Sequence, residues 1–247
     1  MNTAQDADRS EEIAAALTSV RERLTAACTS AGRDPAEVQL LPVTKFFPES
    51  DVRILYDLGC REFGESREQE ATAKVDEFAK FRADSDVRWH MIGHLQRNKA
   101  KAIARWAYAI HSVDSPRLVT SLDKAVSIAL DEGQRTAPLE VLVQVSLDGD
   151  PHRGGVPVAE LEELAAQVES RPALRLSGLM AVPPLGSDAE QEFERLASVR
   201  RDFLVDHPHA TNLSSGMTND LEHAVRHGST CVRVGTALLG ARPITSR

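Results

Sequence analysis

The chain has only three cysteines among its 247 residues, and no two of them stand in C-x-x-C spacing. Cys28, Cys60 and Cys231 are therefore expected to be buried thiols in a reducing compartment, and neither a disulfide framework nor a zinc site is expected. No apolar run approaches the length of a membrane span, and Met1 to Ser10 lacks a basic stretch followed by an apolar one. These absences predict a cytoplasmic protein without a membrane partner.

Positive charge is also scarce. The formal net charge is -8 and the isoelectric point is near 5.5, with lysine and arginine scattered along the chain. This pattern argues against nucleic acid as a partner. The sequence contains no G-x-G-x-x-G, Walker or G-x-S-x-G motif, so dinucleotide, nucleotide and serine-hydrolase functions have no support.

Short β-rich runs alternate with amphipathic stretches, and no long linker separates them. Eight such strands, each followed by a helix, predict a single-domain α/β fold of the (β/α)8 TIM-type barrel class, with an open doubly wound sheet as the alternative. The expected strands lie near residues 38–45, 60–63, 87–92, 108–112, 139–147, 174–181, 210–213 and 230–234.

An extra N-terminal helix is expected before the first strand. Ser10 is a candidate N-cap, and the apolar positions Ile13, Leu17, Val20, Leu24 and Cys28 recur at helical spacing. Residues 1–9 are expected to be flexible, and residues 10–247 to form the barrel domain.

Lys45 is the first candidate functional residue, because the run Leu40 to Thr44 delivers its amine to the end of a strand. A lysine in this position can act as a Schiff-base nucleophile, although an ordinary solvated loop lysine is the alternative. In barrel enzymes the chemistry lies at the C-terminal ends of the strands.

Two further segments follow the last two expected strands. Residues 213–218 (LSSGMT) and residues 232–236 (VRVGT) combine small residues, hydroxyls and glycine with the start of a helix. Such segments bind phosphate through backbone N–H groups, and the loops after strands 7 and 8 form the common phosphate site of these barrels. Two ordinary turns are the alternative.

A ligand with both an aldehyde and a phosphate would suit this combination, and pyridoxal 5'-phosphate (PLP) has both. Arg233 is the candidate partner of the ring nitrogen. A guanidinium stays charged and cannot accept a proton, so it would keep the ring unprotonated and disfavour strong carbanion chemistry.

Six sequence segments together resemble the pyridoxal phosphate homeostasis protein family, from about residue 10 to the end. They are residues 43–45 (VTK), 63–65 (FGE), 90–99 (HMIGHLQRNK), 178–183 (GLMAVP), 213–218 (LSSGMT) and 232–236 (VRVGT). The resemblance implies one barrel related to the N-terminal domain of alanine racemase, with PLP bound as a Schiff base and no established catalytic turnover. It also implies a role in binding the cofactor, buffering it and delivering it to apo-enzymes.

The resemblance assigns roles residue by residue. Lys45 matches the Schiff-base lysine and Arg233 the ring-nitrogen partner. Ser214, Gly216, Gly235 and Thr236 match the phosphate site, and Ser215 lies inside the same loop with a less defined role. The chain departs from the family pattern at Phe47, Ser66 and Arg153, so an auxiliary cofactor site or exit route could differ here. We expect a monomer.

Several other signals are weaker. His223 and His227 have the spacing of a metal site but no third ligand, so no metal is expected, and His90 is expected to line the barrel while His94 lies in a loop. A PLP-dependent racemase is the alternative function. It needs an acid or base on each face of the cofactor, and the chain has only Tyr56 and Tyr108 and ends without the tyrosine-bearing β-domain of racemases. A Schiff-base aldolase would have only Glu65 as a ready carboxylate.

Overall fold

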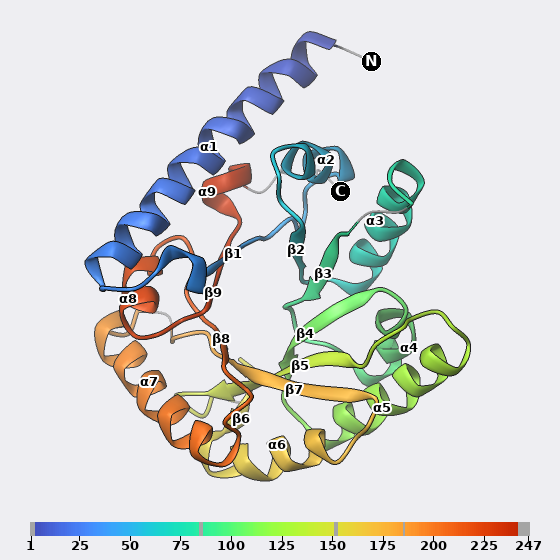
Figure 1. Ribbon diagram of the computed structural model, residues 1–247, viewed down its shortest axis with the longest axis vertical. Coiled ribbons are helices and arrows are strands. Elements are labelled where there is room, and N and C mark those ends of the chain that lie inside the picture. The colour runs from blue at the N-terminus through green and yellow to red at the C-terminus, as the bar shows by residue number, and fades with distance from the viewer. Residues whose placement is uncertain (1–2, 84–85, 151–152, 185, 242–247) are drawn as a thin grey trace.

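The computed structural model describes residues 3–83, 86–150, 153–184 and 186–241. Within these residues, eight parallel strands form a nearly closed barrel surrounded by helices (Figure 1). The predicted barrel is confirmed and the open-sheet alternative is wrong. The strands are β1 (Gln39–Pro42), β2 (Glu62–Glu65), β3 (Arg88–Met91), β4 (Ala107–Val113), β5 (Leu139–Ser146), β7 (Leu174–Met180), β8 (Asn212–Ser214) and β9 (Cys231–Val234).

The strands follow the order β1-β9-β8-β7-β5-β4-β3-β2, and each neighbouring pair is parallel. The ring is closed between β1 and β2 by a bridge of Val43 with Gly64. Just beyond it, the Thr44 N–H donates to the Gly64 carbonyl at 3.0 Å. β1 and β9 are paired up to Pro42 and Val234, so their ends are neighbours in space, although Lys45 and Val234 are 189 positions apart in the sequence.

One short strand was not expected from the sequence. β6 (Val156–Pro157) pairs with the end of β5 outside the main ring. Two residues are too few to show an alternating pattern. Gly155, with a φ of 98°, allows the close approach, because a Cβ there would lie 2.8 Å from the Ser146 nitrogen.

The helices follow the strands as the alternation predicts. The helix after β4, for example, begins at Pro116, with Ser115 as its extended N-cap, and proline suits this first helical position. The elements outside the barrel are α2 (Glu49–Asp57), α3 (Glu68–Phe81), α4 (Ala100–Ala104), α5 (Pro116–Asp131), α6 (Leu161–Glu169), α7 (Ala189–Asp206), α8 (Leu221–Arg226) and α9 (Thr236–Leu239), with 3-10 turns at Pro35–Glu37, Arg97–Lys99 and Val158–Glu160.

The N-terminal helix α1 (Thr3–Ser30) begins earlier than expected. Ser10 is inside the helix and is not its cap. Of residues 1–9, which we expected to be flexible, residues 3–9 belong to the helix and residues 1–2 lie outside the described part of the chain. The reason is visible in Arg9, which donates to the Asp51 carboxylate at 2.7 Å and to the Leu239 carbonyl at 3.0 Å. These contacts attach the first turns of α1 to α2 and α9, a tertiary effect that local sequence does not show.

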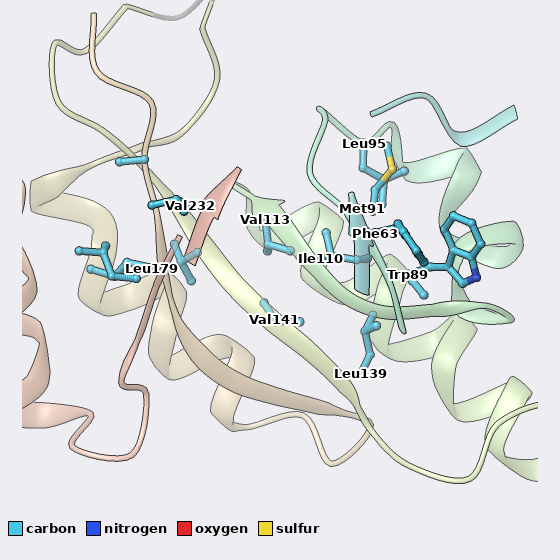
Figure 2. Packing of buried hydrophobic residues seen from close by; sticks show 14 of the residues in the cluster. Phe63, Trp89, Met91, Leu95, Ile110, Val113, Leu139, Val141, Leu179 and Val232 are labelled. Carbon is cyan, nitrogen blue, oxygen red and sulfur yellow. The ribbon is translucent and has the colours of Figure 1, made fainter. Parts of the chain in front are cut away.

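The apolar stripe predicted for α1 is buried where this helix packs on α2, α8 and α9, and the large side chains between the strands and the outer helices are buried as well. Phe63, Trp89 and Ile110 lie in one such layer (Figure 2). Burying a side chain of this size stabilises the fold by about 1.5–3 kcal/mol. No helix of the described part of the chain is long and apolar enough to cross a membrane.

Candidate functional site

A cavity of about 250 Å³ lies at the C-terminal end of the barrel. It contains four of the seven predicted site residues, namely Lys45, Arg233, Gly235 and Thr236. The barrel closure brings them together, because β1 and β9 are paired in the sheet. The other lining residues are Val43, Ile92, Met217, Thr218, Asn219 and Asp220.

Lys45 follows β1 on a tightly anchored turn. The hydroxyl of the preceding Thr44 donates to Glu65 at 2.6 Å, and its carbonyl accepts from Lys74 at 2.7 Å. The following Phe46 has a φ of 70° and its N–H donates to Glu70. A left-handed conformation at a residue with a large side chain is strained, and surrounding contacts must hold it. Lys45 therefore extends into the cavity from a constrained backbone.

Lys74 and Glu65 form a buried ion pair that the sequence did not reveal. Their atoms Nζ and Oε1 are 2.6 Å apart, with side-chain exposures of 4% and 0%. Burial raises the pKa of Glu65, and its Oε2 atom has no hydrogen-bond partner. Because this carboxylate is occupied by Lys74 and Thr44, the structure gives no support to the aldolase alternative that would use Glu65 beside Lys45.

Arg233 is buried at the wall of the cavity. Its guanidinium donates to the Ser214 hydroxyl at 2.7 Å and to the Ala181 carbonyl at 3.1 Å. Burial lowers the pKa of Arg233, but a guanidinium remains charged at any pH that the fold tolerates. The cavity therefore has a fixed positive charge in its wall.

The two serines of the loop after β8 lie behind the cavity wall. The Ser214 hydroxyl contacts Arg233 and His111, and the Ser215 hydroxyl donates to the Ala181 carbonyl at 3.1 Å. Neither residue lines the cavity. Their assignment to the phosphate site stays a prediction, and their hydroxyls are already occupied by protein groups.

Gly216 and Gly235 shape the two loops. Gly216 has a φ of 94°, and a Cβ there would overlap the Cβ of Ala224 on α8. Gly235 passes Val43 so closely that a Cβ would lie 3.2 Å from the Val43 carbonyl oxygen. The short helix α9 begins at Thr236, and the first N–H groups of a helix lack partners within it. The turn from Gly235 into α9 can therefore donate to an anion.

The histidines have the positions expected for structural or barrel-lining residues. His90 is buried inside the barrel, as predicted, while His94 is exposed in its loop. His223 and His227 both contact Glu190 of α7, and these hydrogen bonds lower the pKa of Glu190 to about 2. No cluster of three or more metal-ligating side chains occurs among the described residues.

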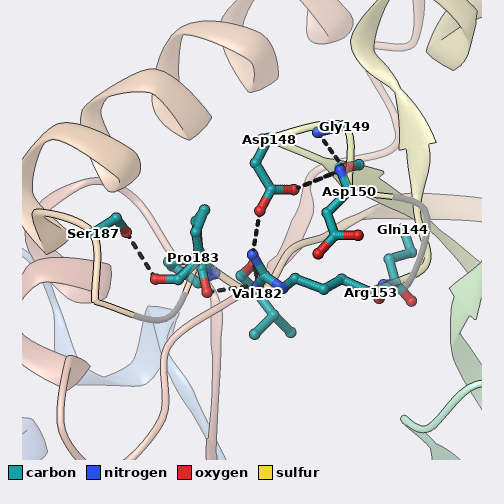
Figure 3. Close-up of polar contacts among 10 residues, drawn as sticks. Gln144, Asp148, Gly149, Asp150, Arg153, Val182, Pro183 and Ser187 are labelled. Carbon is teal, nitrogen blue, oxygen red and sulfur yellow. Dashed lines mark hydrogen bonds and ion pairs between the residues drawn. The ribbon is translucent and has the colours of Figure 1, made fainter.

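Two departures from the family pattern have clear positions. Arg153 donates to Asp148 at 2.6 Å and to the carbonyls of Val182 and Pro183, so it joins the loop after β5 to the segment after β7 (Figure 3). Phe47 packs against the core. All three cysteines are buried and unpaired, as the sequence predicted.

Comparisons with known proteins agree with this architecture. The family model of the alanine racemase N-terminal domain matches residues 15–243. A pyridoxal phosphate homeostasis protein of Mycobacterium tuberculosis (strain ATCC 25618 / H37Rv) is 53% identical over 248 residues, which cover 97% of this chain and 96% of the relative. The protein of that name from Escherichia coli (strain K12) is 38% identical over 239 residues, with coverages of 96% and 99%.

Among solved structures, PipY of Synechococcus elongatus PCC7942 with PLP bound is similar to this chain. The TM-score is 0.77 and the sequence identity 34%, over 92% of this chain and 100% of PipY. The similarity therefore covers nearly the whole barrel, including all seven predicted site residues within the matched family range.

Proposed function

The chain belongs to the pyridoxal phosphate homeostasis protein family, and on that premise we propose that it binds PLP, holding it as a Schiff base on Lys45. The observation that carries the proposal is one cavity containing a lysine, a buried arginine and the start of α9. These residues offer an amine for the aldehyde, a cation for the ring nitrogen and N–H donors for the phosphate.

The chemistry of attachment is a condensation. The Lys45 amine attacks the aldehyde carbon, a C=N bond forms, and the aldehyde oxygen leaves as water. The same reaction run backwards with water frees the cofactor. Attachment through this bond is therefore reversible, which suits a protein that stores a reactive aldehyde and gives it up again.

Arg233 favours binding over catalysis. A guanidinium cannot take up a proton, so the pyridine nitrogen facing it would stay unprotonated and the ring would be a weak electron sink. We infer a non-catalytic protein that delivers PLP to apo-enzymes, acting as a monomer in the cytoplasm. The names of its relatives, which refer to homeostasis, support this role.

The direct test of binding is to add PLP to the purified protein, record the visible absorption band of the Schiff base, reduce it with borohydride and locate the modified lysine by mass spectrometry. We expect modification at Lys45 and not at the buried Lys74. The absence of the band together with no modification of Lys45 would refute the proposal.

Delivery needs a separate test. Holo-protein is mixed with an apo form of a PLP enzyme in the presence of a scavenger that destroys free PLP. We expect activity to appear faster than with an equal amount of free PLP, because the bound cofactor is protected. Equal rates from both sources would rule out delivery while leaving binding intact.

An amino-acid racemase is the second candidate, because the matching family model comes from alanine racemase. Two-base racemisation needs an acid or base on each face of the cofactor. Neither Tyr56 nor Tyr108 lines the cavity. Incubation of the holo-protein with L-alanine decides between the functions, and many turnovers to the D-isomer would favour the racemase.

A further inference from the structure

A line of hydrogen-bonded side chains crosses the barrel interior and ends at Arg233. Glu62, the first residue of β2, contacts His90 Nε2 at 2.8 Å. His90 Nδ1 lies 2.9 Å from His111 Nε2, and His111 Nδ1 lies 2.8 Å from the Ser214 hydroxyl. That hydroxyl accepts from Arg233 at 2.7 Å. The line thus runs from the N-terminal end of the barrel to the cavity at its C-terminal end.

The two end residues determine which group donates and which accepts along this line of hydrogen bonds. Arg233 can only donate, so Ser214 must accept from it. At the other end, burial raises the pKa of Glu62, but hydrogen bonds from His90 and Gln39 and the charge of Arg88 more than offset this and lower it overall. Glu62 is therefore a carboxylate at neutral pH and must accept from His90 Nε2–H.

The arrangement in the middle of the line follows from the protonation of the two histidines. Complete burial is the main reason why the pKa of His111 lies well below its ordinary value, so this ring is neutral and has one N–H. If His90 is also neutral, His111 Nε2–H donates to His90 Nδ1, and the Ser214 hydroxyl donates to His111 Nδ1. A charged His90 would reverse these two bonds, and the Ser214 hydroxyl would then accept from both His111 and Arg233.

We propose that Ser214, His111, His90 and Glu62 are positioning residues for Arg233, forming a one-way hydrogen-bonded chain that orients its guanidinium toward the bound cofactor ring. This inference rests on the proposed function, since it is PLP that Arg233 would meet. In this proposal Ser214 helps to hold Arg233, and Arg233 in turn faces the ring of the cofactor. None of the four residues lines the cavity that contains Lys45, so each would act only through Arg233.

The end of this hydrogen-bonded network at Glu62 borders a second cavity. A cavity of about 200 Å³ at the N-terminal end of the barrel is lined by Glu62, His90 and His111, together with Glu140. Glu140 is buried and pairs with Arg175, and among the described residues no hydrogen bond or ion pair joins it to Glu62, His90, His111 or Ser214. It is therefore a matched control, since it is a second carboxylate lining the same cavity.

The direction of the chain can be measured without cofactor, by ¹⁵N NMR of the histidine rings in the apo-protein. We expect both His90 and His111 to be neutral with the proton on Nε2, with peaks assigned through His90→Gln and His111→Gln. Glu62→Gln replaces a carboxylate that can only accept with an amide that can also donate, so the bond direction at His90 is no longer set and the nitrogen shifts of His111, two hydrogen bonds away, should move. Glu140→Gln should leave them in place. A proton on His111 Nδ1 in the unaltered protein, or equal responses to both variants, would contradict the proposed direction of the hydrogen bonds.

The consequence for binding is measured by PLP titration. Glu62→Gln and Ser214→Ala should weaken binding by about tenfold, the effect of losing a hydrogen bond to a charged group, and should shift the absorption maximum of the bound cofactor. Glu140→Gln should change the affinity by less than about twofold. Equal affinities for all three variants would overturn the positioning role. If the unaltered protein bound no PLP, the proposed function would fail, while the NMR measurement would still decide the direction of the chain.

Discussion

Lys74 donates a hydrogen bond of 2.7 Å to the carbonyl oxygen of Thr44, the residue directly before Lys45. The same ammonium group pairs with Glu65, whose carboxylate also accepts from the Thr44 hydroxyl. The backbone that carries the candidate Schiff-base lysine is thus attached to α3 of the next βα unit. Lys45 is positioned by tertiary contacts on its neighbours, while its own side chain lines the cavity.

Replacing Lys74 by methionine should destabilise the protein strongly. The change leaves the Glu65 carboxylate buried without its partner, and breaking a buried ion pair in this way costs about 3–5 kcal/mol. Urea unfolding followed by circular dichroism measures the effect. The double variant with Lys74→Met and Glu65→Gln is the control and should recover part of the loss. A single variant as stable as the unaltered protein would contradict a structural role for the pair.

Lys45→Ala and Thr236→Ala should separate the two parts of cofactor binding. The first abolishes the covalent bond but leaves weak binding through the phosphate. The second weakens binding by about tenfold, as expected for one hydrogen bond to an anion, but preserves the Schiff base. Equilibrium dialysis measures affinity and the visible band measures the covalent bond. Equal effects of both variants on both properties would argue against this division of roles.

Gly216→Ala should destabilise the loop after β8. The φ of 94° is unfavourable for alanine, and its Cβ would overlap the Cβ of Ala224. We expect a loss of about 1–3 kcal/mol by thermal or urea unfolding. Gly32→Ala is the matched control, since its φ is 68° and nothing lies within 4 Å of the new Cβ, so it reports backbone strain alone. If both variants lost the same stability, the overlap with Ala224 would have no energetic effect.

Cys231 should be unreactive toward thiol reagents while the protein is folded. Burial raises the pKa of this thiol to about 11 from an ordinary value of 9.0, so the nucleophilic thiolate is scarce at pH 8. Because the pKa is higher in the folded state, the stability that this group contributes is present below pH 9 and is lost as the pH rises toward 11. A colorimetric thiol assay should detect all three cysteines in urea. Rapid modification of Cys231 in native buffer would disagree with its burial.

Short-range patterns in the sequence were sufficient to predict the barrel, its eight ring strands, the buried stripe of α1 and the loops that carry Lys45, Gly235 and Thr236. These features depend on residues within about one or two turns of each other, through period-2 alternation, helical spacing and turn chemistry. The short sequence range of these patterns also explains why two features, β6 and the start of α1, were not predicted. β6 is too short to show a period, and the early start of α1 depends on Arg9 reaching α2 and α9.

The tertiary structure alone decided which side chains support the site. Lys74 and Thr44 are 30 residues apart, and His111 and Ser214 are 103 residues apart. Ring closure brings these groups together inside the barrel, where low exposure makes each hydrogen bond obligatory. No local pattern records such a pairing, because the two partners share neither an element nor a turn. The sequence therefore determined the identity of the residues at the cavity, and the closed barrel determined how each of them is held.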